Sequence, residues 1–401
     1  MTSPITITAR RTDLGSLREI LETQRVRRLD VIAPAHTLSF VNGTLIVPDT
    51  NEPLVTEDGV TQTGGQYDCL GTFDDLLAYR LNIPTAYVRW LREHRLDLFD
   101  ANANALLHGL QGDPIYADAP ADDRKFMIRL FRGDDDGRGV ARGIMSDSFK
   151  PVDNLDVLVA AFAGIREAGM GIDPDLPGDK RITISRCDLT ERNMYVAIDA
   201  PSIRALAPEL LKGYRNPRTG LSADADPSIS AGIVIMNSEL GGGAVKVVPR
   251  ITVLACSNGM TFTKDAFRAI HAGSKREEGI VRYSDDTMRK ELELITAKVR
   301  DAVGTYLDAD YVMTKVREME RLAGVEVTKP EETIKAVVSE AGFPKGMEDD
   351  IFAAFIKGGQ CTAGGVMQAV TYVAQDVESA DTAYDMEDKA QRVLEIAARR
   401  A

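Results

Sequence analysis

The stretch Ala231–Met260, AGIVIMNSELGGGAVKVVPRITVLACSNGM, decides the fold of this chain. Two apolar, alternating runs predict strands over 229–237 and 244–256, because successive side chains of a strand point to opposite faces. The glycines at 241–243 lie between two strands, which indicates a hairpin turn and not the strand-to-helix context of a phosphate-binding loop. Pro249 cannot donate to the ladder, so we expect a bulge or a sheet edge there.

Upstream of this hairpin the sequence predicts more strands and one helix. A period of two over 125–130 and 140–145 indicates a second hairpin, with the aspartates of 134–136 in its turn. Apolar residues over 155–165 follow a helical period, and Asp153 is the expected N-cap. Two further strands are predicted over 181–187 and 194–199.

The two ends of the chain are predicted to be mainly helical. Residues 14–29 fit a short amphipathic helix or arm, Asn42-Gly43 marks a hairpin turn within 37–47, and helices begin near Thr72 and Pro84. After Gly259 helical periods dominate. We therefore predict an α+β fold in which a capped helix packs on a central, curved antiparallel sheet. Its expected parts are an N-terminal arm, hairpin and helical unit (1–115), a sheet core (116–290) and a C-terminal helical region (291–401).

Composition limits the class of protein. The chain has 401 residues, 44% of them hydrophobic and 27% charged, which is ordinary for a globular protein. No apolar run is long enough to cross a bilayer, and the N-terminus lacks the apolar segment of a signal peptide, so we expect a cytoplasmic protein without a membrane partner. The four cysteines lie far apart, and we expect reduced, mostly buried thiols.

Catalytic motifs are not recognisable in this sequence. The chain has only four histidines, none in a nucleophile motif, and it has no Walker loop, GxSxG or HExxH. Glu239 with Lys246 is the nearest approximation to a metal-dependent nuclease site, with a spacing that fits no standard pattern. We expect no metal and no cofactor, and a non-catalytic protein.

Cations on several predicted strands suggest a basic sheet face, although the formal net charge is -13. If the apolar strand faces point to the core, the opposite faces carry these cations, and others lie near turns and in the segment that follows. A solvated outer face explains any single strand equally well, whereas agreement across strands favours nucleic-acid binding. The candidate DNA-binding residues are Lys125, Arg129, Arg142, Lys150, Arg181, Arg186, Arg192, Lys246, Arg250, Arg268, His271, Lys275, Arg276 and Arg282.

Aromatic side chains could serve this face as platforms for unpaired bases. A place in the core or at its rim explains each of them as well. The candidates are Phe149, Tyr195, Phe262 and Tyr283.

Three sequence elements together resemble a family of phage- and plasmid-encoded proteins of unknown function. They are the stretch at 231–260, RGIMSDSFKPVDN at 142–154 and TAGGVMQAVTYVAQ at 362–375. The resemblance extends over roughly residues 125–375. Family members typically have a more basic, aromatic version of the second element, and Trp and Asn in the third, where this chain has Gly365 and Gln368.

The order of elements is also similar to that of phage recombinases of the single-strand annealing class. That resemblance implies DNA held in a basic groove around an oligomeric ring, with no nucleotide or metal consumed. Our first hypothesis is therefore a phage-encoded, ATP-independent protein that binds and anneals single-stranded DNA as a homo-oligomer, with a phage exonuclease as a possible partner. The alternatives are a phage interaction protein that sequesters a host factor, and a metal-dependent nuclease.

Overall fold

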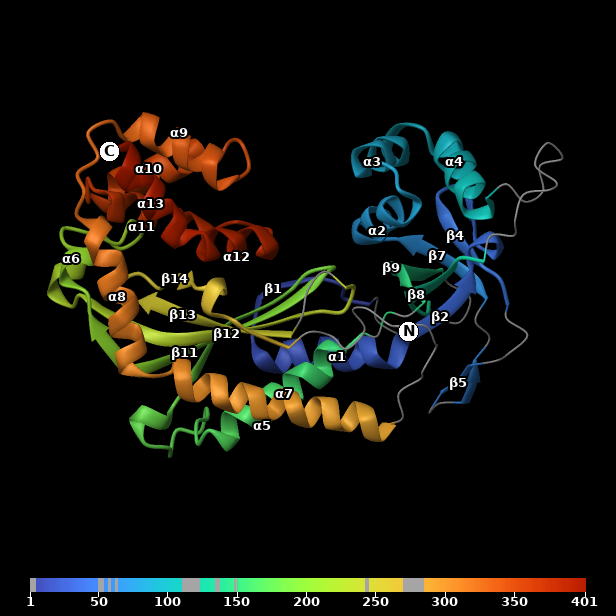
Figure 1. Ribbon diagram of the computed structural model, residues 1–401, viewed down its shortest axis with the longest axis horizontal. Helices are drawn as coiled ribbons and strands as arrows, with labels where there is room; N and C mark the ends of the chain where they lie inside the picture. Colours follow the sequence, from blue (N-terminus) through green and yellow to red (C-terminus); the bar gives the residue numbers. More distant parts are fainter. Residues whose placement is uncertain are drawn as a thin grey trace.

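Two large sheets, a separate two-stranded sheet and thirteen α-helices are the main elements of the described part of the chain. The computed structural model describes residues 5–49, 54–56, 59–61, 64–109, 123–133, 138–147, 149, 151–241, 245–269 and 285–401. Figure 1 shows the larger sheet as a middle layer with helices below and above it, and the smaller sheet at one end. The predicted α+β fold with a curved antiparallel sheet is confirmed.

The larger sheet is antiparallel throughout, and the stretch 231–260 lies at its centre. Alternate residues such as Ile233 and Ile235 of one strand and Val247 and Ile251 of the next are buried in the main core, as the period of two predicts. Its strands in spatial order are β1 (Ala9–Thr12), β10 (Thr183–Leu189), β11 (Asn193–Leu206), β12 (Ser228–Ser238), β13 (Val245–Val253) and β14 (Asn258–Thr261), with β15 (Phe267–Ala269) also paired to β13.

Pro249 lies in the middle of β13, where that strand changes its partner. Residues 250–253 pair with β14, and residues 245–247 pair with β15. Pro249 falls between these two ladders and faces Ile233 of β12 on the other side. The predicted irregularity is therefore a gap between two short partner strands.

One face of the larger sheet packs on three helices, α1 (Leu14–Arg27), α5 (Asn154–Glu167) and α7 (Asp285–Tyr306). They form the layer below the sheet in Figure 1. Gly164 allows α5 and α7 to approach closely, because a Cβ there would lie 2.9 Å from Cβ of Val299. Helix α7 belongs to this layer, so the sheet core and the helical region are not separated near residue 290.

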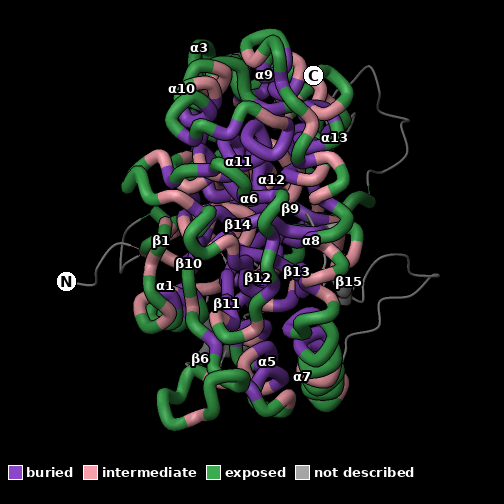
Figure 2. Tube along the Cα trace, turned by 90° about the vertical axis from the view of Figure 1, so that its left-hand side faces the viewer, coloured by how far each residue is buried: buried purple, intermediate pink, exposed green. Residues whose placement is uncertain are grey.

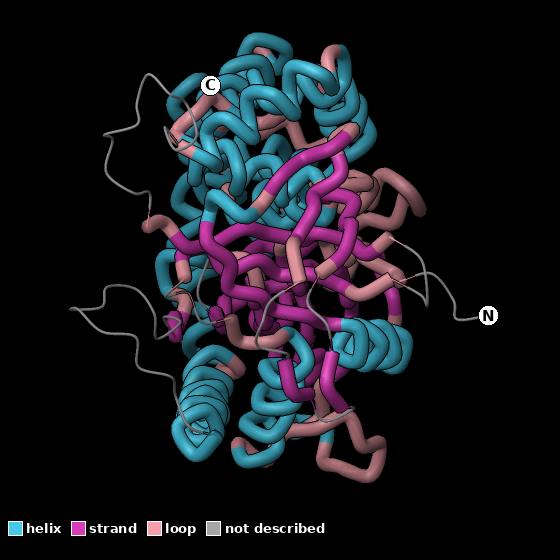
Figure 3. Tube along the Cα trace, turned by 90° about the vertical axis from the view of Figure 1, so that its right-hand side faces the viewer, coloured by secondary structure: helices cyan, strands magenta, loops and turns pink. Residues whose placement is uncertain are grey.

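The opposite face of the larger sheet is covered by C-terminal helices. Figure 2 shows buried residues continuing from the central strands into α11 and α12, and Figure 3 shows the strands between two helical layers. Tyr384 of α12 stacks on Tyr195 of β11, with ring centroids 4.0 Å apart. The helices of this region are α8 (Ala309–Ala323), α9 (Pro330–Ala341), α10 (Glu348–Gly358), α11 (Ala363–Ala374), α12 (Ala380–Asp388) and α13 (Ala390–Arg400), and the short α6 (Pro208–Leu211) contacts α8.

The smaller sheet joins the N-terminal region to the hairpin predicted at 125–145. Asn42 and Gly43 have positive φ at the β3–β4 turn, as predicted. Its strands in spatial order are β2 (Arg28–Pro34), β8 (Lys125–Phe131), β9 (Gly139–Ser146), β7 (Gly65–Cys69), β4 (Thr44–Val47) and β3 (Ser39–Val41), and β5 (Leu54–Thr56) pairs separately with β6 (Gly59–Thr61).

Helices α2 (Gly71–Leu81), α3 (Thr85–His94) and α4 (Leu96–His108) pack with the smaller sheet around a second core. Since β2 pairs with β8, a boundary near residue 116 does not separate two sheets. The aspartate turn at 134–136 lies outside the described residues.

Two composition-based predictions can be compared with the structure. Within the described ranges, none of the helices combines the length and apolarity that a bilayer span requires. All four cysteines are free thiols; Cys187 and Cys256 are buried, Cys69 is half-buried and Cys361 is exposed.

The contact between α5 and α7 gives a first prediction. Gly164→Ala should lower the free energy of unfolding by about 1–3 kcal/mol, because the added methyl group overpacks the contact with α7. Gly304→Ala in α7 is the matched control, since a Cβ there has no neighbour within 4 Å, and it should raise stability by about 0.5–1 kcal/mol. Urea unfolding of both variants measures the effects, and equal behaviour would contradict the close approach.

Candidate functional site

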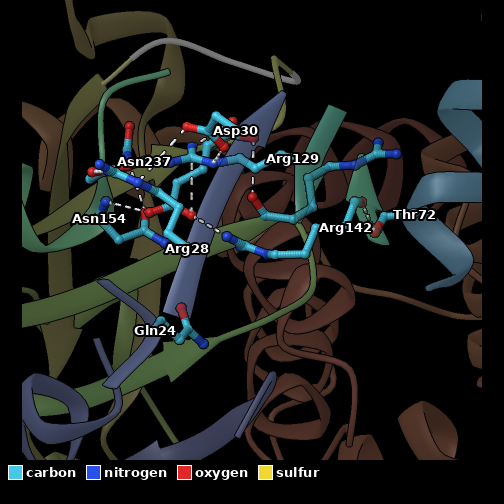
Figure 4. A network of polar contacts seen from close by, with 12 residues as sticks. Gln24, Arg28, Asp30, Thr72, Arg129, Arg142, Asn154 and Asn237 are labelled. Carbon is cyan, nitrogen blue, oxygen red and sulfur yellow. Dashed lines mark hydrogen bonds and ion pairs between the residues drawn. The ribbon is translucent and has the colours of Figure 1, made fainter. Parts of the chain in front are cut away.

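Two of the predicted DNA-binding arginines, Arg129 and Arg142, lie in a buried cluster of ion pairs between the two sheets (Figure 4), which we call the joint. Arg142 Nη1 lies 2.6 Å from Oε2 of Glu239, at the end of β12. Arg129 contacts Asp153 at the start of α5, and its Nε lies 3.2 Å from Oδ1 of Asp30. With Arg28, which also pairs with Asp153, three arginines meet three carboxylates.

This joint has a structural role. Glu239 Oε1 also accepts the backbone N–H of Asn154 at 2.6 Å, which ties β12 to the start of α5. Burial raises the pKa of Glu239, but Arg129 and Arg142 outweigh it and lower this pKa to about 2. The carboxylate therefore stays ionised, and two guanidinium groups occupy it. Asp153 sits at the N-cap of α5, but its side chain makes no capping bond; it binds arginines instead.

The metal-dependent nuclease hypothesis pointed to Glu239 and Lys246. Glu239 is engaged by the two arginines of the joint, whereas Lys246 is on β13, paired in register with Met236 of β12. In the part of the chain that the structure describes, no three His, Cys, Asp or Glu side chains are grouped to hold a metal ion.

Two further candidate arginines, the half-buried Arg186 and the buried Arg250, lie on the outer face of the larger sheet. The orientation of Arg250 is as predicted, whereas the sequence predicts Arg186 near a turn. The expected exposure of both is wrong because the C-terminal helices cover this face. Arg186 Nη1 lies 3.0 Å from Oε1 of Glu387 in α12, and Arg250 Nη1 lies 2.8 Å from Oδ1 of Asp199. Glu387 is also 3.8 Å from Arg250, so one carboxylate serves both arginines.

Beside these ion pairs a polar pocket of about 320 Å³ remains between the sheet and the end of α11. This volume is at the lower end of the range for ligand pockets. Arg186, Arg250 and Ser230 line its floor, and Arg11, Thr183 and Ser257 line its exposed side. We define these six residues as the arginine pocket.

Two polar atoms in the floor of the arginine pocket make no hydrogen bond with any described residue. The Ser230 side chain is 1% exposed, and its hydroxyl makes no hydrogen bond with any described residue. Nη2 of Arg186 is likewise buried and makes no hydrogen bond within the described ranges. Buried polar groups are normally hydrogen-bonded, so such exceptions require an explanation. A ligand that accepts from both groups would supply it.

Two residues with positive φ line this pocket. Four non-glycine residues in the described ranges have positive φ. Asn42 belongs to a hairpin turn and Asn82 to a helix C-cap, where positive φ is ordinary. Ser257, with φ 59°, ends the turn at 254–257 between β13 and β14, where positive φ is likewise ordinary. Arg11, with φ 53°, lies where the register of β1 with β10 shifts, and both residues line the arginine pocket.

Arg11 is the exposed cation of the arginine pocket. Burial is the main cause that lowers the pKa of Arg11; Arg10 and Arg186 lower this pKa further, and Asp376 and Asp188 act in the opposite direction. The nearest carboxylate oxygen of Asp376 is 4.0 Å away, and the Arg11 side chain is half exposed. The exposure of Arg11 and its distant carboxylate partner leave its guanidinium accessible to an incoming anion.

Two of the sequence elements described above, 231–260 and 362–375, position this pocket by contacting each other. Asn258 Nδ2 donates to Oε1 of Gln368 at 2.9 Å, and Gln375 Nε2 donates to Oδ1 of Asn258 at 2.6 Å. A Cβ on Gly259 would lie 2.6 Å from Cζ of Arg250, so glycine is needed for the guanidinium to fit. The element at 257–260 therefore joins the element at 362–375 beside the pocket.

The predicted DNA-binding residues do not form one continuous trough in the described structure. Arg186 and Arg250 meet in the arginine pocket, whereas Arg129 and Arg142 are held by the ion pairs of the joint. The remaining candidates are dispersed or undescribed. Lys125 is exposed at the start of β8, Arg181 precedes β10, and Arg192 lies 3.8 Å from Asp75. Lys246 is half-buried, and Arg268 is described only by its backbone in β15. The candidates outside the described residues are Lys150, His271, Lys275, Arg276 and Arg282.

The aromatic platforms expected beside the DNA are mostly core residues. Tyr195 and Phe262 are buried, Phe149 is half-buried beside Gly241, and Tyr283 lies outside the described residues. Sequence reasoning missed Arg11, Ser230 and Ser257 as pocket residues. The dense cations from Arg10 onward and the Ser257-Asn258-Gly259 run were visible signals for two of them.

Comparison of this chain with protein-family models, with curated proteins and with solved structures gives no match.

The joint gives a second prediction. Glu239→Gln preserves the shape of the side chain but leaves Arg142 without its carboxylate and removes one of the three carboxylates around Arg129, so at neutral pH it should lower the free energy of unfolding by about 3–5 kcal/mol. Because the folded-state pKa of Glu239 is lowered from 4.5 to about 2, the wild type has this stabilisation in full above pH 4.5 and loses it as the pH falls toward 2. The difference between wild type and variant should shrink by up to about 1.4 kcal/mol per pH unit in that window.

Urea unfolding above and below the ordinary glutamate pKa measures this difference. Glu395→Gln, which changes an exposed carboxylate of α13, is the control and should differ little from wild type at either pH. A pH-independent effect of Glu239→Gln would show that the carboxylate is not held ionised by the two arginines.

Proposed function

We propose that this protein binds single-stranded DNA without catalysing a reaction, and that the arginine pocket holds a phosphate of the bound strand. The observation that carries the proposal is that Arg11, Arg186 and Ser230, whose hydroxyl makes no hydrogen bond with any described residue, line one pocket. A phosphate oxygen accepts hydrogen bonds from guanidinium and hydroxyl groups alike. The pocket offers donors of both kinds at one place.

The ion pairs in the floor of the arginine pocket restrict which of its groups can bind an anion. Arg186 and Arg250 already have carboxylate partners, and breaking a buried ion pair is costly. Arg11 has only a distant partner and lies at the exposed side of the pocket. The phosphate would therefore contact Arg11 directly and use the free Nη2 of Arg186 without displacing Glu387.

A net charge of -13 makes binding at this pocket a local and salt-sensitive interaction. We further propose, from the resemblance to annealing recombinases, that the protein is phage-encoded and works in the host cytoplasm as a homo-oligomer. It would pair complementary strands without ATP, with a phage exonuclease supplying single strands. Free thiols in all four cysteines are in keeping with that compartment.

Fluorescence anisotropy with a short labelled single strand tests the proposal, and Arg11→Asn is the informative variant. Asparagine tolerates positive φ, so this change removes the charge without adding backbone strain. We expect weaker binding and a salt dependence whose log–log slope is smaller by about 0.7, the value of one phosphate contact on a single strand. Lys212→Asn, on an exposed cation that follows α6, should leave both unchanged.

The outcomes distinguish a protein that does not bind DNA from one that binds DNA away from the arginine pocket. Wild-type protein that fails to bind the strand at low salt would remove the proposed function. Equal losses in the two variants would show that DNA binds elsewhere. A parallel assay with two complementary labelled strands and no ATP tests annealing, and divalent-metal-dependent degradation of a strand would support the nuclease alternative instead.

A further inference from the structure

A largely apolar groove of about 870 Å³ lies between α1 and α5. Leu14, Leu155, Phe162 and Ile172 contribute to its lining. Val159 of α5 also lines it and is 63% exposed. Its charged rim is largely neutralised within the chain, because Arg18 pairs with Glu22 and Arg25 pairs with Asp156. We call it the α1–α5 groove.

A projecting apolar patch lies elsewhere on the same chain, on α3 and α4. Tyr87 and Trp90 lie one turn apart on α3, and Leu98 and Leu106 lie two turns apart on α4. Asn102 Nδ2 lies 3.4 Å from the Tyr87 hydroxyl, so the two helix faces adjoin. All four apolar side chains are exposed, Trp90 by 51%. We call this surface the aromatic patch.

The chemistry of the aromatic patch fits a protein partner better than nucleic acid. Tyr, Trp and Arg are enriched at protein interfaces. The arginines around the patch already have carboxylate partners: Arg89 pairs with Asp75, Arg92 with Asp74 and Arg95 with Asp97. They leave little positive charge for a phosphate backbone, whereas the exposed rings would still gain from burial in an apolar site.

From the groove and the patch on one chain we infer that copies of this protein associate head to tail, with the aromatic patch of one copy seated in the α1–α5 groove of the next. Figure 1 shows α3 at the top of the molecule and α1 and α5 at the bottom, so the aromatic patch cannot reach the α1–α5 groove of its own chain. Such a heterologous contact builds an open chain or a closed ring. This inference does not depend on DNA binding.

The charges at the two surfaces are complementary as well. Arg166 of α5 lines the groove and makes no ion pair with any described residue. Glu93 of α3 is 78% exposed and has only the His94 ring within ion-pair distance, at 3.9 Å. Seating the patch in the groove would bring an acid of one copy near an unpaired arginine of the next.

Light scattering coupled to size-exclusion chromatography tests the inference on the full chain without DNA. The wild type should form oligomers. Val159→Glu in the groove and Trp90→Glu in the patch should each weaken association by at least about tenfold. Val26→Glu, at a valine of α1 that is 67% exposed but does not line the groove, is the matched control and should associate like the wild type. Circular dichroism shows whether each variant is folded.

Mixing the two interface variants makes the test specific. The Val159→Glu copy keeps an intact patch and the Trp90→Glu copy keeps an intact groove, so an equimolar mixture should give dimers and no larger species. Three results would overturn the inference: a monomeric wild type, which would leave the groove to a foreign protein; oligomers of Trp90→Glu alone, which would indicate a groove-to-groove contact; and mixed variants that stay monomeric.

Discussion

The pairing of buried arginines with carboxylates from other elements is the constraint on which the rest of this structure depends. A guanidinium cannot be buried without a partner, because desolvation of the charge costs several kcal/mol. Glu387 of α12 meets Arg186 and Arg250, and Glu239, which directly follows β12, meets Arg129 and Arg142. Each pair fixes where one layer can sit on another, the first for the C-terminal helices and the second for the smaller sheet.

The same constraint decides where the arginine pocket lies. The outer face of the larger sheet is apolar around Tyr195, Val234 and Val248, and α12 packs there with Tyr384. Toward Arg250 the face becomes polar, with Thr252 and Asp199 hydrogen-bonded to each other. An apolar helix gains little from covering such a surface. The covering helices therefore end at the polar part of the sheet face, next to Arg250. The arginine pocket remains there and is open on the side of Arg11.

Sequence periodicity predicted the strands, the hairpin turn at Asn42-Gly43 and the face on which Arg250 lies, since these are local properties. It could not predict that the face is covered, because that depends on helices more than a hundred residues further along the chain. The register that places Asp199 across from Gly232, next to Arg250, is equally non-local. Asp153 shows the same limit: its position predicted a helix cap, and tertiary contact with Arg129 gave it another role.

The two proposed surfaces lie on opposite sides of the larger sheet, so one copy can use both at the same time. The α1–α5 groove is below the larger sheet, whereas the arginine pocket is above it, so a copy seated in the groove does not cover the pocket through that contact. One pocket with a single exposed cation, Arg11, whose carboxylate partner is 4.0 Å away, would bind a polyanion weakly on a chain of charge -13. A head-to-tail assembly would repeat that pocket at a regular spacing, and linked weak sites reach a joint affinity that far exceeds that of each site alone. Assembly would then be the condition under which a locally basic pocket on an acidic protein holds a long strand.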